Sequence, residues 1–261
     1  MKLKTQMTAG AAMAVVAIFA LAGVDGRAHA QAPTASRADW PADINPESAG
    51  RLPTPKREDL SPADQKIWDE VEGQLQSGGL PALEKDRPLV RMYSPGVAKG
   101  LGDAHHYLKY DAGIDDRLMN IAVLTTTREL TAQFEWTQWE LHARDPKDPR
   151  YLEPYILDVI KTCKPVTGLG EKDAAVITLG REMFGPRKVS PETFAKMLQL
   201  FGPRKTVDIE ELMSLYAQTT EEQVVFDQQL HPGQKPLLPK NATPCGVSPS
   251  ASLSWVPDLL R

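Results

Sequence analysis

The chain has 261 residues, of which 30 are Lys or Arg and 34 are Asp or Glu, so its formal net charge is −4. A mildly acidic chain whose basic residues are dispersed argues against nucleic acid as a partner, because nucleic-acid-binding domains concentrate positive charge. The chain holds only two cysteines, and they are far apart in the sequence, which excludes a CxxC redox pair.

The N-terminus has the three parts of a secretory signal peptide. Lys2 and Lys4 precede an apolar run over residues 9–24, and the sequence AHA at residues 28–30 provides small residues for a cleavage site. A membrane anchor is the alternative, but the run is shorter than the roughly 20 residues of a membrane-spanning helix. We predict a signal peptide over residues 1–30, a mature protein that is periplasmic or secreted, and no membrane association after cleavage.

Proline-rich segments flank the central part of the chain. Residues 31–60 show no apolar period and predict an extended or disordered arm, and residues 231–261 predict an irregular tail. An oxidising compartment permits a disulfide between Cys163 and Cys245, which would tie this tail to the end of a helix. Two free, buried thiols fit the sequence equally well.

Between the arms, apolar residues recur with helical spacing, and no stretch shows the sustained alternation of a strand. The pairs Ser61-Pro62 and Ser94-Pro95 each provide a cap and a proline at the first helical position, so they predict helix starts. A further helix is predicted over residues 150–163. We therefore predict an all-α domain over residues 61–230.

A central helix is predicted to follow Asp115-Asp116, whose negative charges favour a helix N-terminus. This helix is apolar on several sides, which indicates that it is buried in the middle of the domain. The weak helix propensity of the three threonines at residues 125–127 predicts a kink there.

The pentapeptide FGPRK occurs twice, at residues 184–188 and 201–205. In each copy we predict that an apolar residue closes a helix, that Gly adopts the left-handed conformation of a cap, and that Pro prevents continuation. No third copy exists, so the pattern indicates a duplicated helix end and not a solenoid repeat. A short helix is predicted to start at Ser190, between the copies, and a long one at Val207.

Residues 117–145 are apolar in their first half and dense in reactive groups in their second half. At ~100° per residue, four side chains of this stretch lie near one helical face and are predicted to converge. They are Arg128, Glu135, Trp139 and His142.

Four short motifs occur in a fixed order: RMYSP at residues 91–95, Arg117-Leu118, QFEWTQ at residues 133–138 and GLGEKD at residues 168–173. This order resembles the carboxymuconolactone decarboxylase family, which includes the alkylhydroperoxidase D-like proteins. The resemblance covers roughly residues 60–230. It implies an alkylhydroperoxidase D-like helical bundle, a homo-oligomer (trimer or hexamer), and a site buried among helices near a subunit interface.

The residues that the family uses for peroxide chemistry are replaced in this chain. In the peroxidase members, a Glu stands twelve residues before the first Cys of a CxxC, and a His stands four residues after the second. Placing Glu135 at the second Cys puts Ala132 at the first, Asn120 at the Glu and Trp139 at the His. A thiol peroxidase needs one thiolate to attack the peroxide and a second thiol to resolve the product, so peroxidase activity is not expected.

Two hypotheses follow for the dense segment. In the first, Glu135 is an acid or base and His142 its proton partner, Arg128 binds a substrate carboxylate, and Trp136 and Trp139 line the substrate site. The protein is then a cofactor-free lyase or isomerase that acts on a small organic acid.

In the second hypothesis, Arg128 and Glu135 form a buried structural ion pair, the tryptophans belong to the core, and His142 is a solvated residue at a helix end. The protein is then a non-catalytic helical oligomer that binds a ligand or a partner.

No cofactor or metal site is predicted. His105 and His106 are adjacent, so on a helix they point ~100° apart and cannot both bind one metal ion. The sequence has no glycine-rich phosphate loop and no Ser nucleophile elbow.

Overall fold

The computed structural model describes residues 35–77 and 89–245 of the chain. The predicted signal peptide and the last part of the tail lie outside these residues. Within them, the regular structure is helical, and the extended backbone pairs only in an isolated bridge between Asn45 and Gly50. None of the described helices is long and apolar enough to cross a membrane.

The helices are α1 (Pro62–Ser77), α3 (Pro95–His106), α4 (Asp116–Glu129), α5 (Gln133–Arg144), α6 (Pro154–Lys161), α7 (Glu171–Phe184) and α8 (Pro191–Val225). Short helical turns are η1 (Arg37–Asp39), η2 (Arg57–Asp59), η3 (Leu89–Tyr93) and η4 (Tyr107–Asp111).

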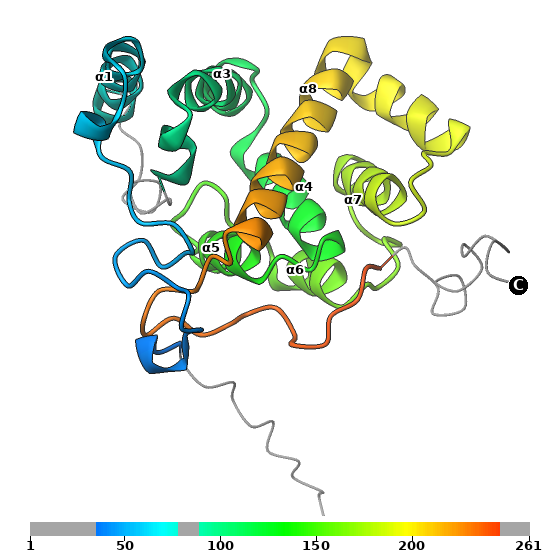
Figure 1. The fold of residues 1–261 in the computed structure, drawn as a ribbon. Coiled ribbons are helices and arrows are strands. Elements are labelled where there is room, and N and C mark those ends of the chain that lie inside the picture. The colour runs from blue at the N-terminus through cyan, green and yellow to red at the C-terminus, as the bar shows by residue number, and fades with distance from the viewer. Residues whose placement is uncertain (1–34, 78–88, 246–261) are drawn as a thin grey trace, which may run out of the picture. The chain divides into compact units, whose positions relative to one another are not determined.

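Helix α4 lies at the centre of the bundle, as its apolar sequence predicts. It packs against α5, α6, α7 and α8, and every residue from Leu118 to Glu129 is buried. Figure 1 shows α8 lying across α4, with α7 beside both. The Asp115 side chain caps α4 by accepting a hydrogen bond from the Leu118 amide (3.1 Å). A helix buried on all sides fixes the positions of its neighbours, so α4 sets the frame for the rest of the domain.

The predicted kink at residues 125–127 is wrong. Each of these threonines bonds back to a carbonyl in the preceding turn, for example Thr125 Oγ1 to Ile121 O (2.7 Å), and the backbone stays helical. The chain breaks four residues after Thr127, at Thr131, which has a φ of 54°, and α5 begins at Gln133. Residues on the two sides of this break therefore do not share one helical face.

The two FGPRK copies behave differently. In the first, α7 ends at Phe184 as predicted, but Gly185 has a φ of −77°, and the left-handed residue is Arg187 (φ 58°). In the second, Gly202 has a positive φ (71°), but its ψ of 172° is extended and not that of the predicted left-handed cap. The chain resumes as a helix at once, so that α8 is two helical segments joined at a kink. The second segment thus begins before the predicted Val207.

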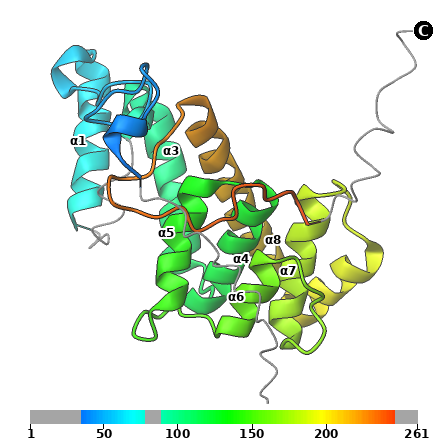
Figure 2. The same ribbon diagram turned by 90° about the horizontal axis from the view of Figure 1, so that it is seen from below.

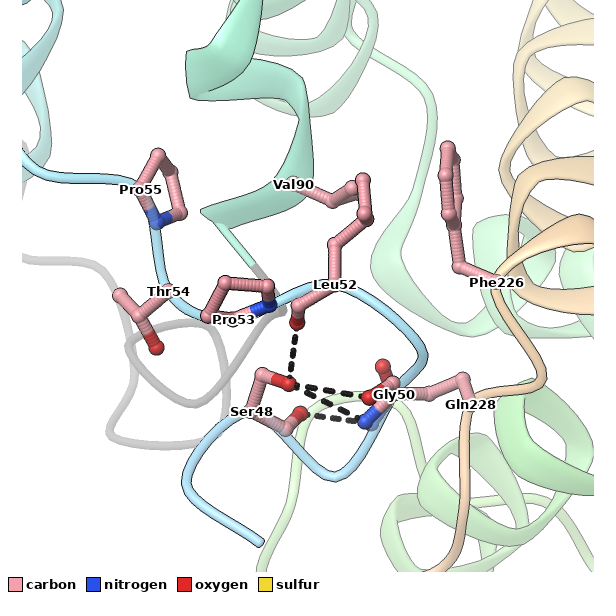
Figure 3. Close-up of a pocket in the computed structure, with 9 residues that line it drawn as sticks. All are labelled: Ser48, Gly50, Leu52, Pro53, Thr54, Pro55, Val90, Phe226 and Gln228. Atoms are coloured by element: carbon pink, nitrogen blue, oxygen red, sulfur yellow. Dashed lines mark hydrogen bonds between the residues drawn. The ribbon is translucent and has the colours of Figure 1, made fainter. Parts of the chain in front are cut away.

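The N-terminal arm lies along the segment that follows α8. Ala35 N donates to Gln234 O (2.7 Å), and Gln229 N donates to Ala49 O (2.8 Å). Between the arm and this segment is a pocket of about 10 Å³, which has room for roughly one water molecule. Figure 3 shows that Ser48, which lines the pocket, forms hydrogen bonds with the backbone of Gly50 and Leu52. The pocket is too small for an organic substrate.

The described part of the C-terminal tail, up to Cys245, crosses the bundle and is joined to it by a disulfide. Figure 2 shows it running past α5 and α4 toward α7. Leu238 is buried in the main core, and a disulfide joins Cys245 to Cys163, just beyond α6, with the Cα atoms 5.2 Å apart. Of the two states that the sequence left open for the cysteines, the structure has the disulfide.

The close approach of α7 to α4 and α8 provides a test of the packing. A Cβ at Gly180 would lie 2.5 Å from Met213 Cε and 2.6 Å from Thr125 Cγ2. The Thr125 side chain is fixed by its bond to Ile121 O, so it cannot move aside. We expect Gly180→Ala to destabilise the protein by about 1–3 kcal/mol, although alanine has the better helix propensity. Gly100→Ala in α3, where nothing lies within 4 Å, is the control and should stabilise the protein by about 0.5–1 kcal/mol in urea unfolding. A stabilising Gly180→Ala would contradict this packing.

Candidate functional site

Glu135 and Trp139 form the centre of the candidate site, on one face of α5. Glu135 is 5% exposed. Its Oε1 accepts a hydrogen bond from Trp139 Nε1 (3.0 Å), and its Oε2 accepts one from Gln223 Nε2 of α8 (2.6 Å). Both donors are uncharged, and in the part of the chain that the structure describes, no Lys, Arg or His forms an ion pair with this carboxylate. A buried carboxylate with only neutral partners keeps its charge uncompensated at short range.

Side chains from three other parts of the chain lie close to Trp139. The rings of Trp139 and Tyr216 of α8 pack at right angles, with their centroids 5.2 Å apart. The Lys109 Nζ and Arg150 Cζ atoms lie 5.8 and 5.6 Å from the Trp139 ring centroid. Tyr216 in turn contacts His105 Nε2 through its hydroxyl (3.3 Å). The sequence did not identify Tyr216, Lys109, Arg150 or Gln223 as site residues.

His142 lies at the edge of the same cluster, with its side chain 14% exposed. Its Nδ1 is 2.7 Å from Asp148 Oδ2, and Arg150 donates to both oxygens of Asp148 (2.8 and 3.0 Å). The alternative that His142 is a solvated residue at a helix end is therefore wrong. The ring packs at an angle against Trp139, with the centroids 6.0 Å apart.

The pKa values of His142 and Asp148 determine the charges of these two side chains at neutral pH. Burial opposes ionisation of Asp148, but hydrogen bonds from Arg150 and His142 outweigh it and hold its pKa at about 2. Burial lowers the pKa of His142, and the Asp148 hydrogen bond only partly offsets this. At neutral pH the pair is thus a carboxylate and a neutral imidazole, which places the proton on Nδ1 and leaves Nε2 as an acceptor.

Arg128 is not part of this cluster, which corrects its predicted role. Its Nε donates to Lys161 O (2.8 Å), its Nη1 to Thr243 O (2.7 Å), and its Nη2 to Cys163 Sγ (3.1 Å). The break after α4 turns it away from Glu135. The predicted ion pair between Arg128 and Glu135 is absent for the same reason, and burial lowers the pKa of Arg128.

Trp136 is also placed elsewhere. It is fully buried, and its indole N–H donates to Glu140, a carboxylate with 0% exposure that also accepts hydrogen bonds from Arg144 and Lys161. This is a compensated structural cluster on a different face of α5. The predicted substrate-binding role of Trp136 finds no support in this position.

The family resemblance places Asn120 at the position of the Glu and Ala132 at that of the first Cys. Asn120 is fully buried, its Nδ2 donates to Arg150 O (2.6 Å), and its Oδ1 has no hydrogen-bond partner. Thr220, one helical turn before Gln223, is likewise buried with an unpartnered Oγ1. Buried polar atoms without a partner are uncommon in native proteins. Ala132, at the N-cap of α5, has no polar side chain.

The comparison with solved structures supports this architecture. The bundle is similar to the crystal structure of an alkylhydroperoxidase AhpD core, an uncharacterized peroxidase-related protein from Ralstonia eutropha JMP134. The TM-score is 0.50 at 14% sequence identity, over 69% of this chain and 92% of that chain. The fold is alkylhydroperoxidase D-like. At this identity the likeness concerns the fold alone.

Comparisons at the level of sequence add no relative: no family model matches the chain, and no curated protein does. Among the described residues, no group of three His, Cys, Asp or Glu side chains is arranged to hold a metal ion.

The low pKa of His142 predicts how stability depends on pH. The unfolded imidazole has a pKa of about 6.5, so near pH 6 the unfolded chain binds more protons than the folded one. The stabilising contribution of the neutral His142 is complete above about pH 6.5 and is lost as the pH falls through the folded pKa. We expect the advantage in unfolding free energy of the wild type over His142→Gln to shrink between about pH 7.5 and pH 5. Urea unfolding at several pH values measures it, and an advantage that does not change with pH would contradict the assignment.

Proposed function

We propose that this protein is an exported, carboxymuconolactone decarboxylase-like enzyme that carries out acid–base chemistry on a small organic acid, as a lyase or isomerase. The observation that carries the proposal is the Glu135 carboxylate, buried and bonded only to neutral donors at the position that the resemblance assigns to a thiol. Such a carboxylate can accept and return a proton during a reaction. No thiol is needed for this chemistry.

Each remaining member of the cluster has a role in this proposal. His142, with Nδ1 held by Asp148 and Nε2 left as an acceptor, is the second proton carrier. Lys109 and Arg150, which both lie close to the ring of Trp139, replace Arg128 in this proposal as the cations that meet a substrate carboxylate. The unpartnered Asn120 Oδ1 and Thr220 Oγ1 supply hydrogen bonds to the polar groups of the ligand.

Export is supported by the signal-peptide pattern of residues 1–30 and is consistent with the disulfide, which persists in an oxidising compartment. A homo-oligomer, trimer or hexamer, is proposed from the resemblance. Size-exclusion chromatography with light scattering measures this assembly.

The central experiment compares Glu135→Gln with the wild type. Mature protein is incubated with carboxylated lactones and unsaturated organic acids, and proton NMR detects decarboxylation or isomerisation. For any acid that turns over, we expect Glu135→Gln to lower kcat by about 10²–10⁴-fold, because the amide cannot exchange a proton. The variant should fold, since the amide still accepts from Trp139. Glu171→Gln, at a glutamate whose side chain is 73% exposed, is the matched control and should keep full activity. Full activity in Glu135→Gln would end the proposal.

A second candidate function is ligand binding without catalysis. It is favoured by the fact that both oxygens of Glu135 are already paired within the protein. On this candidate, the main effect of Glu135→Ala is on stability, because it leaves the Trp139 and Gln223 donors unpaired, at about 1–3 kcal/mol each. Thermal melting measures the loss, and an unchanged Tm would count against this candidate.

A further inference from the structure

The disulfide between Cys163 and Cys245 has different surroundings at its two sulfur atoms. Both cysteines are partly exposed. The Arg128 guanidinium donates to Cys163 Sγ at 3.1 Å. On the other side, the Cys245 amide donates to the carboxylate of Glu129 (2.9 Å). The positive charge of Arg128 therefore lies next to Cys163 Sγ, and the negative charge of Glu129 lies next to the backbone of Cys245.

Arg128 is held in this position by the fold. It is 6% exposed, and its other two donors are fixed on Lys161 O and Thr243 O. A second guanidinium, that of Arg181, donates to Lys164 O (2.8 Å), on the residue after Cys163. Guanidinium groups close to a thiol favour its thiolate form.

One feature of the fold opposes a negative charge at Cys163, namely the C-terminal end of α6 just before it. The two arginines also act here, because Arg128 bonds to Lys161 O and Arg181 to Val159 O, two carbonyls of that helix end. Their positive charges offset the partial negative charge of the carbonyls. The charged group that contacts Cys163 Sγ is the Arg128 guanidinium, and the Glu129 carboxylate interacts electrostatically with both arginines.

We propose that Cys163–Cys245 is a thiol–disulfide exchange site, in which Arg128 stabilises Cys163 as the leaving thiolate and an exported dithiol protein is the reaction partner. This site is distinct from the position of the family CxxC, which Ala132 and Glu135 occupy here. It does not depend on the acid–base function proposed for Glu135.

The chemistry runs in two balanced steps. A thiolate of the partner attacks Cys245 Sγ; a mixed disulfide forms, the Cys163–Cys245 bond breaks, and its electron pair leaves on Cys163 Sγ. The second thiol of the partner, after losing its proton, then attacks the partner's own sulfur in the mixed disulfide, and Cys245 leaves and takes up a proton. Two electrons pass from the dithiol to this pair, so that the partner becomes a disulfide and the pair becomes two thiols. The Cys245 end of the tail is then released from its covalent attachment.

The first test locates the leaving group. Mature wild-type protein is treated with excess reduced glutathione, free thiols are alkylated with iodoacetamide, and mass spectrometry maps the products. We expect the glutathione mixed disulfide on Cys245 and the alkyl group on Cys163. An equal distribution, or glutathione mainly on Cys163, would overturn the proposal.

The second test measures the two thiols in proteins that keep Arg128. In Cys245→Ser, we expect the pKa of the Cys163 thiol, read from thiolate absorbance, to lie at least about one unit below the ordinary value of about 8.5. In Cys163→Ser, the Cys245 thiol should titrate at or above that value. Ordinary values for both thiols, or the reverse order, would refute the role of Arg128.

The third test removes the guanidinium. We expect Arg128→Gln to slow cleavage of the disulfide by dithiothreitol by at least about threefold, because the leaving thiol becomes less acidic. Arg128→Lys, which keeps the charge, should restore part of the rate. Arg204→Gln, at an arginine whose side chain is 77% exposed, is the control and should react as the wild type does. Faster cleavage in a folded Arg128→Gln would mean that Arg128 only shields the bond, and would overturn the proposal; if that variant does not fold, the first two tests decide.

Discussion

The burial of α4 along its whole length is the constraint on which the structure depends. A helix surrounded on all sides can carry charged groups only where partners satisfy them. At its C-terminal end, Arg128 and Glu129 are both drawn into the interior. Arg128 is satisfied by carbonyls of α6 and of the tail, and Glu129 accepts the amide of Cys245. The end of α4 requires hydrogen-bond partners, and the tail provides them by crossing the bundle at this point. The disulfide between Cys163 and Cys245 adds a covalent link to the contact that these hydrogen bonds make.

Much of the helical architecture could be predicted from local sequence, because its signals are local. Ser-Pro pairs mark helix starts, Asp115 caps α4, and the apolar composition of α4 indicates its burial. The break before α5 could not be located in this way. The threonine triplet has weak helix propensity, yet a buried threonine hydroxyl can bond to its own helix, and packing on all sides overrides propensity. An error of a few residues in the position of the break changes which side chains share a face.

The position of the break between α4 and α5 explains which residues of the candidate site could be predicted from the sequence. Glu135, Trp139 and His142 lie together because all three belong to α5, and helical spacing is reliable within one helix. Arg128 belongs to α4, so extending the same face across the break gave it the wrong neighbours. Lys109, Arg150 and Tyr216 reach Trp139, and Gln223 reaches Glu135, from other parts of the chain, which no local pattern reveals. The polar stripe of Tyr216, Thr220 and Gln223 on the otherwise buried face of α8 was the one signal that could have indicated a polar partner for α5.

The two buried glutamates on α5, Glu135 and Glu140, differ in their hydrogen-bond partners, and this difference suits one to a chemical role and the other to a structural role. Glu140 is the more deeply buried, but Arg144, Lys161 and Trp136 surround it, and the two cations form ion pairs with it. Taking up a proton there would break two ion pairs, so Glu140 is unsuited to proton transfer and suited to joining α5 to α6. Glu135 has an indole and an amide as partners, and neither changes charge when the carboxylate does. Among the described residues no ion pair holds Glu135 as it holds Glu140, and this suits Glu135 to the acid–base role proposed for it.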